Sequence, residues 1–311
     1  MMPAILLTGA SGFVGGALAE KLLQQGRTVR AIGRRAPKEP IPFFEGAIDD
    51  PVVLQEALEA VDCVVHLAGR AHQLRDTSRD PLRSFMVANC DVSASLARQA
   101  AAAGVRRFIF ISSIGVNGAV TCGTPFTEGS VPAPHSDYAR SKYEAEIALR
   151  TVAKESGLEL VIIRPPLVYG PDAPGNFGTL LRWIDKGIPL PLGAIHNKRS
   201  LVGIDNLVDL IACCIDHPAA TNQVFLAGDG EDLSTTELLR GVAKAMGKRA
   251  KLIAVPAGVL RVGATLVGKK DMAQRLLGSL QVDISKTCEV LDWKPPYTVE
   301  EGLRRCVEPS N

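Results

Sequence analysis

The stretch AILLTGASGFVG, residues 4–15, joins an apolar run to three glycines and the start of a helical segment. The apolar run predicts a strand, and the pattern of Phe13–Gln25 predicts a helix. Gly9 permits a tight turn, Gly12 lets a ligand approach the backbone, and Gly15 allows the helix to pack closely. Because a helix N-terminus offers free N–H groups and a positive dipole end, this unit is predicted to bind phosphate.

Short apolar runs alternate with helical segments up to residue 164. The runs predicted as strands are Ala4–Leu7, Thr28–Ile32, Cys63–Leu67, Phe108–Ile111 and Leu160–Ile163. The segments predicted as helices are Phe13–Gln25, Val52–Glu59, Ala88–Ala103 and Tyr138–Glu155. Such alternation is typical of a parallel sheet with helices on both faces. The sequence therefore predicts an α/β fold with a Rossmann-type doubly wound parallel sheet.

The glycine spacing G-x-x-G-x-x-G in this strand–turn–helix context indicates a dinucleotide site. After Arg164, four prolines between residues 165 and 174 break the alternation. We therefore expect a second, smaller α/β lobe that binds the substrate. The predicted division gives 1–166 and about 200–228 to the dinucleotide-binding domain, and 167–199 and 229–311 to the lobe.

Composition argues against several classes of protein. The net charge is only +2 and no basic stripe is visible, so we expect no nucleic-acid partner. No apolar stretch is long enough to cross a bilayer, and the N-terminus lacks the pattern of a signal peptide, so we expect a cytoplasmic protein without membrane insertion. The seven cysteines lack metal-ligand spacing, which predicts free thiols and no metal.

The end of the second predicted strand indicates which dinucleotide is bound. An acidic residue there would hold the ribose hydroxyls of NAD, but this chain has Gly33-Arg34-Arg35. Guanidinium groups suit a 2′-phosphate, so we predict NADP, with NAD as the alternative. The alternative interpretation is that Arg34 and Arg35 are a solvated surface pair without a ligand. Ile48 and Asp49 follow in Gly46-Ala47-Ile48-Asp49 and are placed near the adenine.

Three further residues indicate proton and hydride chemistry. Ser113 follows the strand Phe108–Ile111, at the edge where parallel sheets bind ligands. Tyr138 and Lys142 are four residues apart and share one face of a helix. An ammonium and an oxidised nicotinamide would both favour the phenolate, so we expect the pKa of Tyr138 to be lowered. Tyr138 is the predicted acid–base group, Ser113 orients the substrate oxygen and Lys142 also holds the ribose.

These residues make the chain resemble the extended short-chain dehydrogenase/reductase family over nearly its whole length. Further matching segments are His66–Gly69, Asn89, Arg164–Pro171 and Asp292–Pro295. The resemblance implies cofactor contacts by Gly9, Ser11, Gly12, Phe13, Val14, Gly15, Arg34, Arg35, Ile48, Asp49, Leu67, Ala68, Gly69, Asn89, Tyr138, Lys142 and Pro165. It also implies a homodimer formed through the helices Ala88–Ala103 and Tyr138–Glu155.

For the substrate, the resemblance implies a nucleotide-sugar whose diphosphate contacts Asn176, Arg199 and Arg275, with Ser113 and Tyr138 at the sugar. The arginines are otherwise ordinary solvated charges. Two substitutions depart from the family pattern: Leu167 replaces an asparagine, and Asn117-Gly118 replaces Tyr-Gly. The Asp-Glu pair of the 4,6-dehydratases is missing after Ser113, which disfavours dehydration.

Within the family the likeness is greatest to bacterial reductases of UDP-4-keto-6-deoxy-N-acetylhexosamines, which form UDP-N-acetylquinovosamine or UDP-N-acetylfucosamine for surface polysaccharides. The segments Gly69–His72, Arg199–Asn206 and Gly278–Lys286 carry it. Reduction of the 4-keto group by NAD(P)H is the leading prediction. A UDP-hexose 4-epimerase with tightly bound NAD is the first alternative, because it uses the same Tyr, Lys and Ser. A non-catalytic dinucleotide sensor is the remote alternative.

Overall fold

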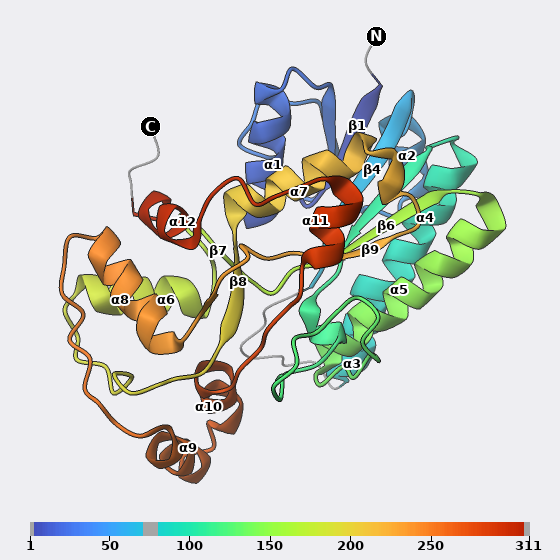
Figure 1. The fold of residues 1–311 in the computed structure, drawn as a ribbon. Coiled ribbons are helices and arrows are strands. Elements are labelled where there is room, and N and C mark those ends of the chain that lie inside the picture. The colour runs from blue at the N-terminus through green and yellow to red at the C-terminus, as the bar shows by residue number, and fades with distance from the viewer. Residues whose placement is uncertain (1–2, 71–79, 308–311) are drawn as a thin grey trace.

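The computed structural model describes residues 3–70 and 80–307, without the side chains of Asn176, Lys270 and Asp271. His72 lies outside this part of the chain. Within the described residues, parallel strands form a seven-stranded sheet (Figure 1). In spatial order its strands are β3 (Phe43–Glu45), β2 (Val29–Gly33), β1 (Ala4–Thr8), β4 (Val61–His66), β5 (Arg107–Ile111), β6 (Glu159–Arg164) and β9 (Val224–Leu226).

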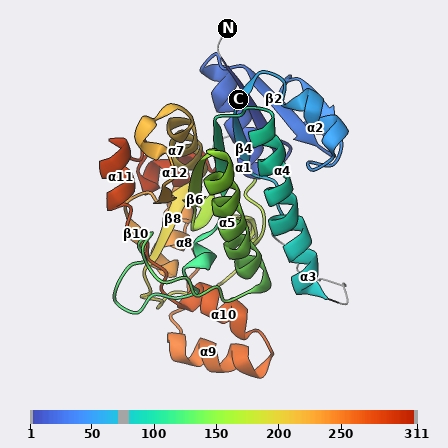
Figure 2. The same cartoon turned by 90° about the vertical axis from the view of Figure 1, so that its right-hand side faces the viewer.

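Helices cover both faces of this sheet, as the sequence predicted. One face carries α1 (Phe13–Gln24) and α7 (Ile204–Asp216), and the other carries α2 (Pro51–Ala57), α4 (Val92–Ala102) and α5 (Asp137–Ser156). Figure 2 shows α4 and α5 side by side. A short α3 (Pro81–Met86) and a π-helix, Val87–Asp91, lead into α4, so the predicted helix Ala88–Ala103 begins with a π turn.

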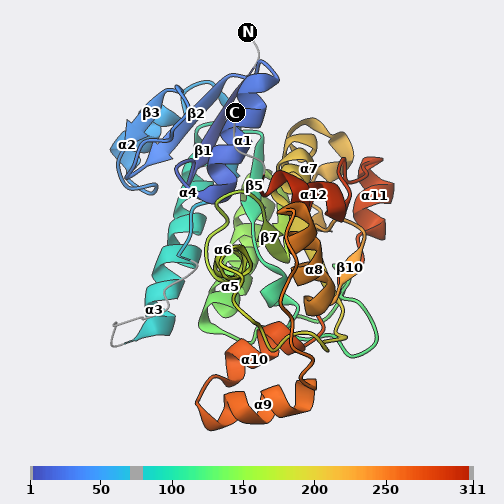
Figure 3. The ribbon, with the colours of Figure 1, turned by 90° about the vertical axis from the view of Figure 1, so that its left-hand side faces the viewer.

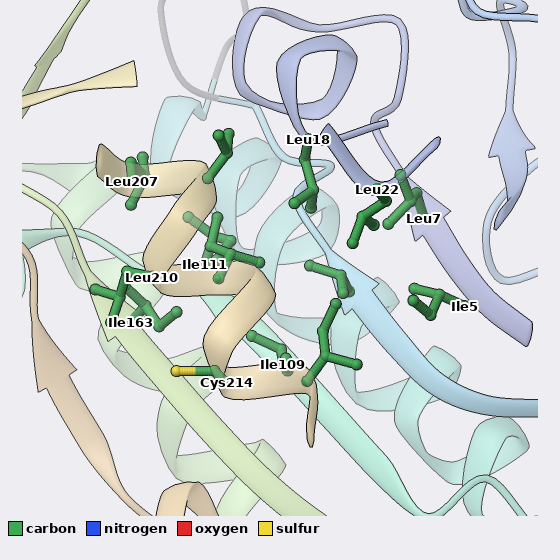
Figure 4. Close-up of a cluster of buried hydrophobic side chains, with 14 of the residues drawn as sticks. Ile5, Leu7, Leu18, Leu22, Ile109, Ile111, Ile163, Leu207, Leu210 and Cys214 are labelled. Atoms are coloured by element: carbon green, nitrogen blue, oxygen red, sulfur yellow. The ribbon is translucent and has the colours of Figure 1, made fainter. Parts of the chain in front are cut away.

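The strands of the sheet are apolar on both faces because each face packs on helices. In β5, Ile109 and Ile111 belong to the core beneath α1 and α7, whereas Phe108 and Phe110 belong to the core beneath α4 and α5. Figure 4 shows the first of these cores, in which Leu210 of α7 approaches the strands. The predicted burial of this continuous apolar run is therefore confirmed.

A smaller lobe follows β6 and has its own sheet and core. The sheet consists of β10 (Asp232–Leu233), β8 (Arg199–Gly203) and β7 (Leu167–Tyr169), with β7 and β8 parallel. Its helices are α6 (Asn176–Asp185), α8 (Thr235–Ala245), α9 (Ala257–Leu266), α10 (Lys270–Leu277) and α12 (Val299–Arg305). Figure 3 shows α9 and α10 at the far end of this lobe.

Two segments pack differently from the predicted division. The strand β8 pairs within the small sheet, although we had placed residues from about 200 in the larger domain. The helix α11 (Ser285–Leu291) and Trp293 pack into the core with α1 and α7, although we had placed them in the lobe. We therefore propose that residues 204–227 and 285–293 belong with the large sheet. In the described residues no helix is both long and apolar enough to span a membrane.

Candidate active site

The glycine loop between β1 and α1 packs against the loop that follows β4. Gly9 has φ +73°, which only glycine adopts freely. A Cβ on Gly9 would lie 2.8 Å from the Ala68 nitrogen, and one on Gly15 would lie 2.1 Å from the Gly9 oxygen. Both contacts are too short for any side chain. The predicted turn at Gly9 and close packing at Gly15 are therefore confirmed.

The N-terminus of α1 fits the phosphates of a dinucleotide. Its capping residue is Gly12, in an extended conformation, and no side chain caps the helix. The first N–H groups of a helix have no partner within the helix, so here they remain directed at the loop. With no Cβ at Gly9 or Gly12, an anion can reach these groups and the positive end of the helix dipole.

A groove of about 1030 Å³ runs along the carboxyl edge of the large sheet. This is at the upper end of the usual size of ligand pockets, about 300–1,000 Å³. Of the predicted cofactor residues, its walls contain Gly9, Ser11, Gly12, Arg34, Arg35, Ile48, Asp49, Leu67, Ala68 and Gly69. They do not contain Phe13, Val14, Gly15, Asn89, Tyr138, Lys142 or Pro165. The groove thus joins the glycine loop to the predicted adenosine contacts.

The arginines at the end of β2 are exposed and line this groove. In the described part of the chain neither Arg34 nor Arg35 has an ion-pair partner. A carboxylate from Asp49 lines the same groove, so this end presents two cations and one anion. A guanidinium can pair with a phosphate, and the carboxylate can accept a hydrogen bond from a ribose hydroxyl.

The predicted catalytic residues lie together at the end of β5. Ser113 is the second residue after the end of β5, whereas Tyr138 and Lys142 lie on the first turns of α5, which Ser136 caps. The phenol of Tyr138 is hydrogen-bonded to Ser113, and its ring meets Phe85 edge-on at 6.3 Å between centroids. A serine hydroxyl and a phenol in contact can share one substrate oxygen.

The side chain of Lys142 is buried and reaches the wall of the groove. Its Nζ donates to the Ile111 carbonyl at 2.9 Å and lies 4.4 Å from the centroid of Phe110. A Cβ on Gly69, in the groove wall, would be 3.3 Å from this Nζ. The ammonium therefore adjoins the inner end of the groove, where it can contact a bound ribose.

We expected the pKa of Tyr138 to be lowered, but the protein's own groups raise it. Burial raises the pKa of Tyr138 to about 12, and the hydrogen bond from Ser113 lowers it only in part. Lys142 is not among the causes of this shift. Burial also lowers the pKa of Lys142 to about 8, which Glu146 partly counteracts. Lowering the phenol's pKa is therefore left to the positive charge of an oxidised nicotinamide.

Asn89 performs a structural task that the sequence did not indicate. Its amide accepts from the Arg70 nitrogen at 2.7 Å and donates to the Arg70 oxygen and to Ser141. It is fully buried in the π-helix, so it ties the loop after β4 to α5. Nearby, His66 Nδ1 is 2.6 Å from Thr8 and Nε2 is 2.8 Å from Ser93, and burial lowers the pKa of His66 to about 3.

A buried ion pair that the sequence did not predict holds the segment around Ser112 and Ser113 in place. Glu146, one turn beyond Lys142, receives hydrogen bonds from Arg164 at 2.6 and 2.9 Å and from Ser112 at 2.6 Å. Arg164 also donates to Asn117, at 3.0 Å. The sequence indicated this pair only through the position of Glu146, which is the third titratable residue at a spacing of four after Tyr138 and Lys142 and shares their face of the helix.

The predicted substrate residues lie in the second lobe. Arg199 begins β8 and donates to the Gly278 carbonyl at 3.1 Å. Burial lowers the pKa of Arg199, and the charge of Arg275 on α10 lowers it further, so the two cations lie near each other. Asn176 is the first residue of α6, and its side chain is outside the description. Two neighbouring cations favour an anion between them.

The model of the NAD dependent epimerase/dehydratase family matches residues 5–228. The chain belongs to this family. A UDP-glucose 4-epimerase from Vibrio cholerae is 47% identical over 99% of this chain and 95% of its own length.

Other members of the family are more distant. The N-acetyl-alpha-D-glucosaminyl-diphospho-ditrans,octacis-undecaprenol 4-epimerase of Escherichia coli O157:H7 is 28% identical over 98% of this chain and 94% of its own. A UDP-glucose 4-epimerase of Thermotoga maritima, solved with UDP-glucose, has a TM-score of 0.79 and 25% identity, and the match covers 98% of this chain and 97% of that one. As a member of the epimerase/dehydratase family, this chain is an NAD-dependent enzyme of the extended short-chain dehydrogenase/reductase type.

Proposed function

We propose that this enzyme moves a hydride at C4 of a UDP-linked hexose, with Tyr138 as its acid–base residue. The observation that carries the proposal is the grouping of Ser113 and Tyr138 with Lys142, whose ammonium adjoins Gly69 in the groove wall. The cofactor, when bound, accepts or returns the hydride. Tyr138 takes the proton of the C4 hydroxyl as that hydride leaves and gives it back on return, while Ser113 orients the oxygen.

The binding residues divide between the two lobes. The glycine loop, Arg34, Arg35, Asp49 and the loop Leu67–Gly69 would hold the dinucleotide, and Lys142 its nicotinamide ribose. Arg199 and Arg275, with Asn176, would hold the diphosphate of the UDP-sugar, because a partly desolvated diphosphate needs cationic or N–H partners. The remaining predicted cofactor residues would act indirectly: Phe13 and Val14 by shaping the glycine loop, and Pro165 by shaping the turn after β6.

Net 4-epimerisation is the first candidate, because the Vibrio cholerae relative, 47% identical over nearly the whole chain, is a UDP-glucose 4-epimerase. Reduction of a UDP-4-keto-6-deoxy-N-acetylhexosamine to UDP-N-acetylquinovosamine or UDP-N-acetylfucosamine is the second candidate. The exposed Arg34–Arg35 pair favours it, since this pair suits NADPH, which a reductase consumes at every turnover. We also propose a homodimer through α4 and α5.

One pair of incubations separates the candidates. The protein is given UDP-glucose or UDP-N-acetylglucosamine without added cofactor, and separately UDP-4-keto-6-deoxy-N-acetylglucosamine with NADH or NADPH, and products are identified by NMR. Interconversion without added cofactor supports the epimerase, and consumption of reduced cofactor supports the reductase. In either case Tyr138→Phe should lower kcat by about 10²–10⁴-fold and leave cofactor affinity nearly unchanged. A variant that keeps most of its rate refutes the assigned role.

A further inference from the structure

The outer face of α9 is apolar and exposed, in contrast to most surface helices. Val259, Val262 and Leu266 have 61%, 63% and 82% of their surfaces exposed, and Val267, just after the helix, has 67%. The spacing of three and then four residues places the first three on one side of the helix. We call these four residues the α9 surface.

The opposite side of α9 is apolar as well. Ala257, Leu260 and Ala264 pack against the core of the second lobe. A surface helix normally carries polar residues on the side away from the core. Figures 2 and 3 show α9 as the outermost element at one end of the molecule, with α10 between it and the rest. The α9 surface is therefore apolar without a covering element in the described chain.

The segment around α9 is strongly basic. Between Gly247 and Val282 the sequence has seven Lys or Arg residues and one Asp. Arg261 lies on the flank of α9 and Lys269 follows the helix, and both are exposed. Lys248 is paired with Asp185. An apolar helix face bordered by unneutralised cations is typical of helices that lie in the headgroup region of a bilayer.

We propose that the α9 surface docks this enzyme on a bilayer that contains anionic lipid. The apolar side chains enter the boundary between headgroups and acyl chains, and Arg261 and Lys269 meet lipid phosphates. A second copy of the chain fits less well, because two basic segments would then face each other. Docking at this depth needs no spanning helix. Docking would also bring the proposed substrate site near the bilayer, because α10 packs against α9 and carries Arg275.

The test is co-sedimentation with vesicles of phosphatidylcholine alone or mixed with phosphatidylglycerol. We expect the full chain to sediment with the mixed vesicles, and less so as salt is raised. The double substitution Val262→Asp and Leu266→Asp should weaken this binding more than tenfold, about the effect of losing two buried apolar side chains. The control Val131→Asp, at a position 84% exposed elsewhere, should bind as the parent does.

Three results would overturn the proposal. The first is a parent protein that fails to sediment with the mixed vesicles, and the second is a double variant that binds them as well as the parent does. The third is a double variant whose oligomeric state changes in sedimentation velocity without vesicles, which would make the α9 surface a contact between copies. The enzymatic proposal is tested separately: Tyr138→Phe should bind vesicles normally, and the double variant should retain turnover of a water-soluble UDP-sugar.

Discussion

Replacing Glu146 by Gln tests whether its buried ion pair with Arg164 supports the region of Ser113, Tyr138 and Lys142. The side chains of Arg164 and Glu146 are 4% and 1% exposed. The amide keeps the size of the carboxylate but removes its charge, so the guanidinium stays buried without a counter-charge. Breaking such a pair from one side costs about 3–5 kcal/mol. Urea unfolding should therefore show a lower midpoint with an unchanged slope.

The same substitution should change the pH dependence of turnover. Burial lowers the pKa of Lys142 to about 8, and Glu146 is the group that raises it. Without that carboxylate the pKa of Lys142 falls further, so the ammonium is lost at a lower pH. The alkaline limb of the kcat profile that depends on Lys142 should then move to lower pH. The control is Glu155→Gln, an exposed position on the same helix. An unchanged unfolding midpoint, or a limb that moves to higher pH, refutes the reasoning.

Three further predictions concern the cofactor side. Gly15→Ala should cost at least about 2 kcal/mol in urea unfolding, because its Cβ would meet the Gly9 oxygen. Gly16→Ala, whose Cβ would lie 3.6 Å from the Ala10 oxygen, should be neutral or stabilising, and equal effects of the two substitutions would contradict this. Burial lowers the pKa of His66 to about 3, so the folded protein is stable with respect to this group above about pH 6.5 and loses stability as the pH drops toward 3. His66→Asn removes this protonation, so acid unfolding followed by circular dichroism should move to lower pH. Replacing both residues of Arg34–Arg35 by Ala should lower kcat/KM for NADPH by about 10–100-fold and change that for NADH little; a parallel loss with both cofactors would exclude a contact with the 2′-phosphate.

The sequence predicts what depends on local pattern. The glycine loop and the Tyr138–Lys142 spacing each lie within a few residues, and the strand–helix alternation is a repeat of such short segments, so their geometry follows from local sequence. The strand β3 was missed because three residues of Phe43–Glu45 carry too little periodicity. The pairing of β8 with β7 was not predicted, because strand pairing is set by contacts between distant segments.

The electrostatics of the site could not be predicted in the same way. Glu146 and Arg164 are 18 residues apart, on different elements, and only the fold brings them together. The lowered pKa of Tyr138 was predicted from its spacing to Lys142 and from the charge of an oxidised nicotinamide. The spacing gives the shared face of the helix but not the degree of burial of the phenol, and burial decides the sign of the shift.

The π turn at Val87–Asp91 carries a consequence for how this region can change by insertion or deletion. A π turn holds one residue more than an α turn, and each helical residue turns the chain by about 100°. Removing a single residue from this turn would leave a regular helix of the same character. A deletion within an α turn would rotate α3 by that angle relative to α4, but the wider π turn absorbs its extra residue, so Phe85 would still face Tyr138. The chain can therefore lose one residue here and keep the wall beside the phenol.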